Sequence, residues 1–308
     1  MKSKLSLLIF LITLCGHAFS EERALSFRGG VFSFISSRSL EDRAPDIERV
    51  IVTIHGSERN AQTYYNSVAG LANRRGVADQ TLVITPHFKL ATDPLLSQEL
   101  FWDDEGWLRG DEAINSPLVN SFDLLDHVMD QLANADLFPR LKVIVLTGHS
   151  AGAQMVQRYA AGSSVREKYQ HLQFKFVVTN PGSYLYLTKR RPLNPGLICS
   201  FHSYKFGLEE LNGYMSRSSI DKLTNQYTLK NVYYLLGEMD TRTDDIDQSC
   251  PAQYQGANRL QRGKFYKAQL DEEFPLNPHR LYTVPGIGHT QYGMYNSEIG
   301  QKILFQEL

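Results

Sequence analysis

Residues 143–162 decide the fold class, and they read Val143-Ile144-Val145-Leu146-Thr147-Gly148-His149-Ser150-Ala151-Gly152 followed by AQMVQRYAAG. The first five residues form a continuous run of β-branched and aliphatic side chains, which is typical of a strand buried on both faces. The last ten residues have a helix-like pattern. Between them, residues 148–152 match G-x-S-x-G, whose glycines are needed because a sharp strand-to-helix turn leaves no room for side chains beside the serine. The stretch therefore predicts that Ser150 stands exposed at the end of a strand, as a nucleophile does.

Similar apolar runs recur along the chain and alternate with helix-like stretches. This alternation favours right-handed crossovers, and so an α/β fold with a mostly parallel central sheet and helices on both faces. Residues 27–35 can add antiparallel edge strands. Because no repeat, low-complexity tract or Pro/Ser-rich linker follows residue 20, we expect a single catalytic domain over residues 21–308. The predicted strands are 50–54, 82–85, 143–147, 176–179, 232–236 and 281–284, and the predicted helices are 61–75, 119–134, 151–161, 258–270 and one after His289.

The first 20 residues differ from the rest of the chain and predict a signal peptide. Lys2 and Lys4 precede an apolar run over residues 5–15, and Ala18-Phe19-Ser20 supplies small residues at the −3 and −1 positions of a cleavage site. The run is short for a permanent membrane anchor, which is the alternative, and no later stretch approaches the roughly 20 apolar residues of a membrane span. We therefore expect a mature protein that is secreted or periplasmic, without membrane attachment after cleavage.

Two cysteines, Cys199 and Cys250, remain after residues 1–20 are removed. In an exported chain such a pair favours one disulfide bond, which would close a loop of about 50 residues. Two buried free thiols are the alternative. The charges of the whole chain are balanced, with 32 Lys+Arg against 33 Asp+Glu and no basic block, which disfavours a nucleic-acid partner.

A nucleophilic serine needs a base to accept its proton and an acid to hold that base. Asp240 follows the predicted strand 232–236, and His289 lies in a glycine-rich loop after the strand 281–284. The carboxyl ends of parallel strands share one edge of the sheet, so we expect Ser150, His289 and Asp240 to meet there. The competing acids Glu238, Asp244, Asp245 and Asp247 are expected to be solvated or to cap turns. His171 and His202 are expected to be structural or solvated, and His279 precedes its strand and so belongs to the opposite edge of the sheet.

The negative charge that develops during acyl transfer needs two N–H donors. The backbone N–H of Ala151, directly after the nucleophile, is one candidate. The turn Ile54-His55-Gly56-Ser57 after an earlier strand supplies the other, the N–H of Ser57, with Glu58 as its alternative. His55 is then expected to hold this loop by hydrogen bonds. A plain glycine turn without catalytic role is the remaining interpretation.

The stretch Phe101-Trp102-Asp103-Asp104-Glu105-Gly106-Trp107 lies in a long insertion after residues 82–86 and holds both tryptophans. Trp102 and Trp107 are candidates for an aromatic substrate-binding wall, and Tyr184 is a candidate on the leaving-group side. An equally supported alternative is that these aromatics pack onto the body of the protein. No spacing in the acidic residues supports a calcium site, so no metal site is predicted.

Taken together, residues 148–152, Arg158-Tyr159, residues 180–186 and residues 250–259 resemble the α/β-hydrolase superfamily over residues 25–308, and more narrowly a group of secreted bacterial and fungal hydrolases whose substrates are mostly unassigned. The resemblance implies a Ser-His-Asp serine hydrolase that needs no metal or organic cofactor. The leading hypothesis is hydrolysis of a small-molecule or polymeric carboxylic ester. The alternatives are an amidase or peptidase with the same triad, or a secreted binding module that keeps the fold without catalysis. The sequence leaves the oligomeric state open.

Overall fold

A computed structural model describes residues 21–196 and 198–306, and the predicted signal peptide lies outside the described residues. Eight strands form the main sheet: β1 (Glu21–Phe27), β2 (Gly30–Ser36), β3 (Arg49–Ile54), β4 (Thr81–Pro86), β9 (Val143–His149), β10 (Gln173–Thr179), β11 (Val232–Gly237) and β12 (Arg280–Val284). Their order across the sheet is β1-β2-β4-β3-β9-β10-β11-β12. Only β2 is antiparallel to its neighbours, β1 and β4, and the other five pairings are parallel. The predicted mostly parallel α/β sheet with antiparallel edge strands is therefore confirmed.

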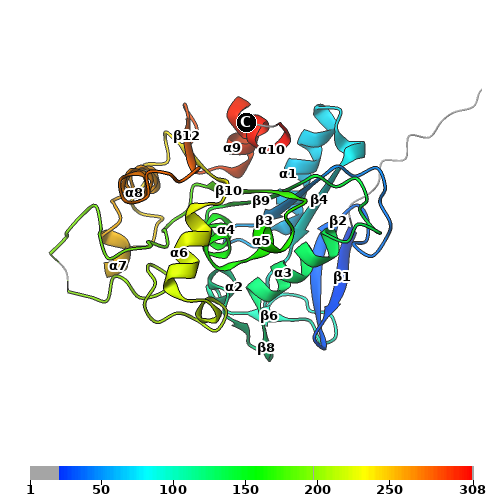
Figure 1. The fold of residues 1–308 in the computed structure, drawn as a ribbon, viewed down its shortest axis with the longest axis horizontal. Helices are drawn as coiled ribbons and strands as arrows, with labels where there is room; N and C mark the ends of the chain where they lie inside the picture. Colours follow the sequence, from blue (N-terminus) through cyan, green and yellow to red (C-terminus); the bar gives the residue numbers. More distant parts are fainter. Residues whose placement is uncertain (1–20, 197, 307–308) are drawn as a thin grey trace, which may run out of the picture.

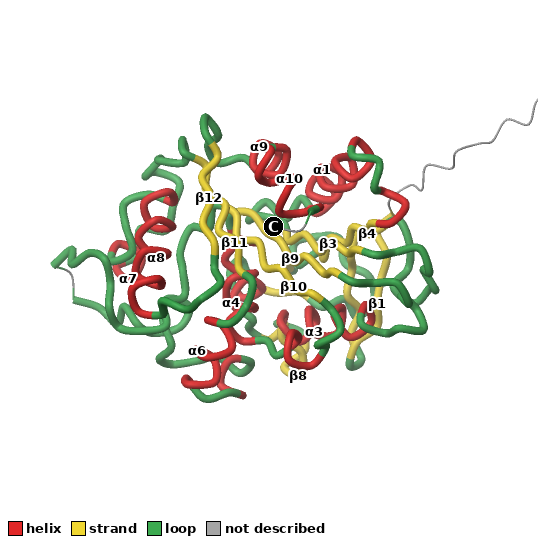
Figure 2. Tube along the Cα trace, turned by 45° about the horizontal axis from the view of Figure 1, so that its top comes forward, coloured by secondary structure: helices red, strands yellow, loops and turns green. Residues whose placement is uncertain are grey.

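Helices cover both faces of this sheet (Figures 1 and 2). On one face lie α1 (Ala61–Arg74), α9 (Gln291–Asn296) and α10 (Glu298–Phe305). On the other lie α3 (Ser121–Leu132), α4 (Ala151–Gly162) and α6 (Ile220–Thr228), and α8 (Arg259–Glu273) packs against β11. The shorter elements are β5 (Lys89–Leu90), β6 (Phe101–Trp102), α2 (Gly106–Arg109), β7 (Glu112–Ala113), β8 (Ser116–Asn120), α5 (Val165–Lys168), α7 (Cys250–Gln253) and the 3-10 helices η1 (Ala78–Gln80) and η2 (Met215–Arg217).

The continuous apolar runs are explained by burial on both sides of the sheet. In β3, Val50 and Val52 contribute to the core beneath α3 and α4, whereas Ile51 between them contributes to the core beneath α1 and α10. Successive side chains of a strand point to opposite faces. A strand covered by helices on both sides must therefore be apolar at every position, as these strands are.

Two further features concern the compartment and the surface. Cys199 and Cys250 form a disulfide bond, as predicted, which ties the loop before η2 to the start of α7.

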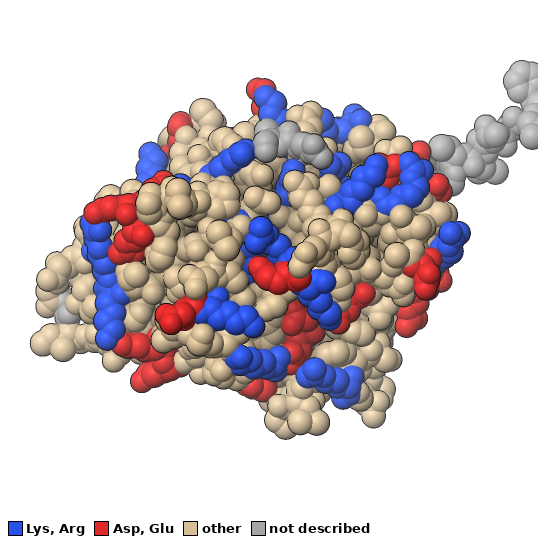
Figure 3. Space-filling view, in the orientation of Figure 1, with Lys and Arg blue, Asp and Glu red and all other residues tan. Residues whose placement is uncertain are grey.

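None of the helices within residues 21–196 and 198–306 combines the length and apolar character that spanning a bilayer requires. The face drawn in Figure 3 carries Lys and Arg side chains interspersed with Asp and Glu, so that face presents no broad region of a single charge.

Candidate active site

Ser150 occupies the turn between β9 and α4, where positions 148 and 152 leave no room for a side chain. Its backbone has φ 59° and ψ −118°, an uncommon conformation for a residue with a side chain, and its N–H donates to the carbonyl oxygen of Thr179 (3.0 Å). A Cβ on Gly148 would lie 2.4 Å from the Gly152 carbonyl group, and a Cβ on Gly152 would lie 2.4 Å from the carbonyl oxygens of Ile54 and His55. The turn is therefore the strained strand-to-helix elbow that the G-x-S-x-G pattern predicts.

Ser150, His289 and Asp240 form a continuous hydrogen-bonded chain. His289 Nε2 lies 3.0 Å from Ser150 Oγ, and His289 Nδ1 lies 2.8 Å from Asp240 Oδ2. Since a carboxylate can only accept, Nδ1 carries the proton, and Nε2 is left as an acceptor for the serine hydroxyl. The Asp240 side chain is 1% exposed and that of His289 is 21% exposed. This geometry can deprotonate Ser150 and hold the resulting imidazolium.

The loops after β11 and β12 are tied together so that Asp240 and His289 meet. The N–H of Met239 donates to the carbonyl oxygen of Ile287 (2.9 Å). Asn180, directly after β10, accepts from the N–H of Gly237 (2.8 Å) and donates to the carbonyl oxygen of Gly288 (3.3 Å). Residues 180–186 entered the sequence analysis through the resemblance, but their pattern did not indicate that Asn180 joins these two loops. The available sequence signal was Asn180-Pro181 directly after a strand, a pair typical of a turn, and the observed φ of 49° at Asn180 fits such a turn.

Among the rival acids, Asp245 lines the cavity over Ser150, whereas Asp244 and Asp247 make contacts within their own loop. Asp244 forms an exposed ion pair with Arg242, and Asp247 accepts from the N–H of Ser249 (2.8 Å) as a turn cap. His279 is buried, and its ring nitrogens lie 3.0 Å from the Tyr234 hydroxyl and 2.9 Å from the carbonyl oxygen of Tyr227. Burial lowers the pKa of this imidazole to about 4.

His55 supports the loop after β3, as expected. Its Nδ1 lies 2.9 Å from the carbonyl oxygen of Gly56, and its Nε2 accepts from the N–H of Phe88 (3.0 Å). Complete burial lowers the pKa of His55 to about 3, so the ring stays neutral and donates from Nδ1. Ser57, two residues later, lines the cavity beside Ser150. Ala151 opens α4, where the first N–H groups have no partner within the helix.

A cavity of ≈ 370 Å³ opens over the Ser150 hydroxyl. Its wall is polar and includes two carboxylates, one guanidinium and two imidazoles. The lining residues are Gly56, Ser57, Glu58, Asn60, Thr63, Tyr64, His149, Ser150, Asp245, Arg259, His289, Thr290 and Gln291.

The structure does not bring Trp102, Trp107 or Tyr184 to this cavity. The two tryptophans are each 1% exposed and Tyr184 is fully buried. Each indole N–H has a hydrogen-bond partner inside the protein. Trp102 donates to the carbonyl oxygen of Asp111 (3.0 Å), and Trp107 donates to the carbonyl oxygen of Asp104 (3.1 Å). Trp107 packs against the His55 ring with centroids 4.8 Å apart. This placement corrects the expectation of a substrate wall and favours the alternative, aromatics that pack on the body.

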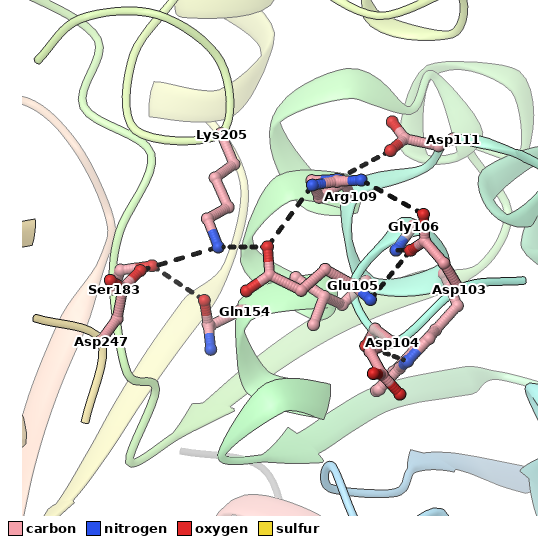
Figure 4. Close-up of polar contacts among 12 residues, drawn as sticks. Asp103, Asp104, Glu105, Gly106, Arg109, Asp111, Gln154, Ser183, Lys205 and Asp247 are labelled. Atoms are coloured by element: carbon pink, nitrogen blue, oxygen red, sulfur yellow. Dashed lines mark hydrogen bonds and ion pairs between the residues drawn. The ribbon is translucent and has the colours of Figure 1, made fainter. Parts of the chain in front are cut away.

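Two of the acidic residues beside the tryptophans, Asp103 and Glu105, form ion pairs within the protein. Asp103 Oδ1 accepts from the N–H groups of Glu105 and Gly106. Figure 4 shows the Lys205 ammonium between the carboxylates of Glu105 and Asp247, at 2.7 and 3.6 Å. Within the described residues no group of three or more Asp, Glu, His and Cys side chains is placed to hold a metal ion.

Two further cavity residues contact the hydrogen-bonded side chains of Ser150, His289 and Asp240. Sequence reasoning gave neither of them a role in the site. The ring of His149, inside the G-x-S-x-G pattern, packs on that of His289 with centroids 4.5 Å apart, and burial holds the pKa of His149 well below its usual value. Arg259 Nη1 lies 3.7 Å from Asp240 Oδ1. The signal for Arg259 was its place in residues 250–259, which carried part of the resemblance.

No family model matches the chain, and no curated protein matches it. Solved structures with similar folds include a poly(3-hydroxybutyrate) depolymerase from Bordetella parapertussis, with 21% identity, a TM-score of 0.68 and coverage of 94% of this chain and 91% of that one. Another is poly(aspartic acid) hydrolase-1 from Sphingomonas sp. KT-1, with 21% identity, a TM-score of 0.67 and coverage of 93% and 98%. At this identity the likeness concerns the fold, and the chain has the α/β-hydrolase fold.

Proposed function

We propose that this protein is an exported serine hydrolase that cleaves a carboxylic ester through an acyl-enzyme. The observation that carries the proposal is the hydrogen-bonded chain from Ser150 Oγ through His289 to Asp240, which ends in an open cavity. A structural serine does not need a strained backbone, a neutral acceptor at 3.0 Å and a buried carboxylate behind that acceptor. Catalysis by a serine nucleophile needs all three.

In the proposed reaction, Ser150 Oγ attacks the ester carbonyl carbon while His289 Nε2 takes its proton. The N–H groups of Ser57 and Ala151 donate to the oxyanion of the tetrahedral intermediate. The intermediate collapses as the imidazolium of His289 gives its proton to the leaving alcohol. A water molecule, deprotonated by His289, then attacks the acyl-enzyme, and a second tetrahedral intermediate releases the acid and restores Ser150. Asp240 holds Nδ1 and stabilises the imidazolium in both halves.

Export rests on the predicted signal peptide at residues 1–20, and the disulfide between Cys199 and Cys250 is consistent with an oxidising compartment. For the substrate, the printed description of one neighbour, a poly(3-hydroxybutyrate) depolymerase, supports including polymeric esters among those tested. The ≈ 370 Å³ cavity is also large enough for a small ester.

The experiment compares the mature protein with Ser150→Ala on esters of graded acyl length and on an amide of matching structure. We expect ester turnover that is lost by at least about a thousandfold in Ser150→Ala. Equal rates in both proteins would refute the proposal. Faster turnover of the amide than of its ester would replace the ester hydrolase with an amidase that uses the same residues.

The matched control is Ser163→Ala, at the end of α4, which removes a buried serine hydroxyl remote from His289. This variant should keep ester turnover within about twofold of the wild type, because its hydroxyl has no hydrogen-bond partner among the described residues. A loss in Ser163→Ala as large as that in Ser150→Ala would mean that the assay reports folding and not catalysis.

A further inference from the structure

Asp240 is an incompletely hydrogen-bonded buried carboxylate. Its side chain is 1% exposed, and only Oδ2 has a hydrogen-bond partner, His289. Oδ1 has none among the described residues. A charge buried in this way is costly unless an opposite charge lies nearby. The guanidinium of Arg259 supplies it, with Nη1 3.7 Å from Oδ1.

Arg259 is held in this position by its own surroundings. It is the first residue of α8, whose start is capped by Asn258, with Oδ1 accepting from the N–H of Gln261 (2.9 Å). The next residue, Leu260, donates its N–H to the main-chain oxygen of Asp240 (3.2 Å). Arg259 Nη2 donates to the carbonyl oxygen of Asp245. The first turn of α8 and Asp240 are thus joined through main-chain and side-chain contacts, and the positive end of the helix dipole adds to the guanidinium charge.

We propose that Arg259 is a positioning residue of the Ser150–His289–Asp240 chain. It holds the Asp240 carboxylate with Oδ2 directed at His289, and its positive charge opposes the charge that His289 gains on protonation. The inference rests on the proposed function, and it assigns a role to a residue that neither the G-x-S-x-G pattern nor the three strand ends identify.

The charged and titratable groups around His289 allow the effect of Arg259 to be isolated. His149 from β9 and Tyr64 from α1 face the same cavity, and burial keeps the first unprotonated and the second protonated near neutral pH. Glu58, before α1, adds a carboxylate that is present in wild type and variant alike, whereas the carboxylate of Asp245, before α7, lies 3.8 Å from Arg259 Nη2 and loses this partner in the variant. Arg259 is the one guanidinium among the cavity-lining residues, so substituting it by glutamine removes a single positive charge beside Asp240.

The sign of the effect follows from this arrangement. A neighbouring cation disfavours a second positive charge, so removing the guanidinium should make protonation of the imidazole easier than in the wild type. In Arg259→Gln the acidic limb of the kcat/KM profile should therefore move to higher pH, by roughly 0.5 to 1 unit. Because Asp240 also loses a contact that fixes its orientation, kcat on the plateau should fall by about tenfold or more.

Two variants separate this role from a structural one. Arg259→Lys keeps the charge, so its acidic limb should return to within about 0.2 pH units of wild type. Arg262→Gln is the matched control: Arg262 is also buried on α8, but it donates only to main-chain oxygens, those of Gly182, Gly256 and Asp247. It should lower the melting temperature without moving the limb. An unmoved limb in Arg259→Gln, or an equal shift in Arg262→Gln, would overturn the inference.

A double-mutant cycle decides the matter if Arg259→Gln alone does not fold. The activity of Asp240→Asn is compared with that of the double variant Asp240→Asn/Arg259→Gln. The double variant lacks both the carboxylate and the guanidinium, so neither charge is left buried without the other. If Arg259 acts through Asp240, the second substitution should change kcat by less than about threefold in this background. A further tenfold loss would show that Arg259 acts independently of Asp240. The proposed function is tested separately, by the loss of ester turnover in Ser150→Ala. The results with the Arg259 variants do not change that test.

Discussion

The backbone of Gly152 is packed directly against the carbonyl group of His55, so closely that a Cβ on Gly152 would lie 2.4 Å from that oxygen. The first residues of α4 and the loop that follows β3 are therefore in main-chain contact. One carries Ser150 and Ala151, and the other carries Ser57. The relative position of the nucleophile and both proposed oxyanion donors thus depends on the absence of a single side chain.

Gly152→Ala should destabilise the protein by more than about 2 kcal/mol and lower kcat, because backbone atoms and not a flexible side chain stand in the way of the new methyl group. Urea unfolding and ester turnover measure the two effects. The matched control is Gly70→Ala within α1, where the nearest obstacle is Arg74 Nη1 at 3.4 Å. This change should stabilise the helix by about 0.5 to 1 kcal/mol. Wild-type stability in Gly152→Ala would contradict the close packing.

Asp240→Asn should lower kcat by about a thousandfold or more, because an amide cannot stabilise the imidazolium and can hold His289 in the wrong tautomer. Steady-state ester turnover above pH 7 gives the number. Asp244→Asn, four residues later in an exposed ion pair, should stay within twofold of wild type. If the two variants lost equal activity, the acid would have been assigned to the wrong carboxylate.

The disulfide between Cys199 and Cys250 joins residues 51 apart in sequence. In the chain-entropy model a loop of this size contributes about 4 kcal/mol to the free energy of unfolding. Replacing both cysteines with serine should therefore lower that free energy by a similar amount in denaturant titrations. Dithiothreitol should destabilise the wild type to the same level and leave the double variant unchanged. A reductant effect on the double variant would point to another cause.

Stability should fall as the pH drops below about 6.5. Burial lowers the pKa of His55 to about 3 and of His279 to about 4, so both imidazoles remain neutral in the folded protein while the unfolded chain takes up protons. The unfolded state then binds more protons between about pH 6.5 and 4, and stability rises with pH in that window. At pH 5 each of the two should cost about 2 kcal/mol relative to pH 8.

Denaturant unfolding at pH 5 and pH 8 tests this dependence. His279→Gln removes one of the two imidazoles, so the loss of stability between the two pH values should shrink by about 2 kcal/mol, whatever the variant loses at pH 8. The control His171→Gln, at an exposed position in the turn before β10, should leave the difference in stability between pH 5 and pH 8 unchanged. A loss of stability that is the same in wild type and His279→Gln would show that other groups cause it.

The fold could be predicted because local pattern and tertiary burial agree. The run at residues 143–147 is apolar at every position, and the structure buries it on both faces as β9. In contrast, α6 was not predicted. Its segment Ile220–Thr228 is only nine residues long and buries the polar Gln226 beside Leu223 and Tyr227, so only two apolar side chains mark its buried face. Gln226 is accommodated because its side chain donates to the carbonyl oxygen of Ala161 (2.6 Å), a contact far away in sequence.

The same distinction applies to the site. Ser150, Asp240 and His289 each follow a strand, so their positions could be inferred from strand ends alone. The places of Arg259 and of the tryptophans depend on distances between loops, which no local pattern encodes. Trp107 in particular packs on His55, from the loop after β3, with ring centroids 4.8 Å apart, a contact between residues far apart in sequence.

The central claim is that Ser150 is an activated nucleophile, and covalent labelling tests it most directly. The folded mature protein would be treated with a fluorophosphonate, and the adduct read by intact mass and peptide mapping beside Ser150→Ala and Ser163→Ala. The structure predicts one adduct per chain, located on Ser150, present in Ser163→Ala and absent from Ser150→Ala. No adduct on the wild type, or an adduct that survives in Ser150→Ala, would contradict the claim.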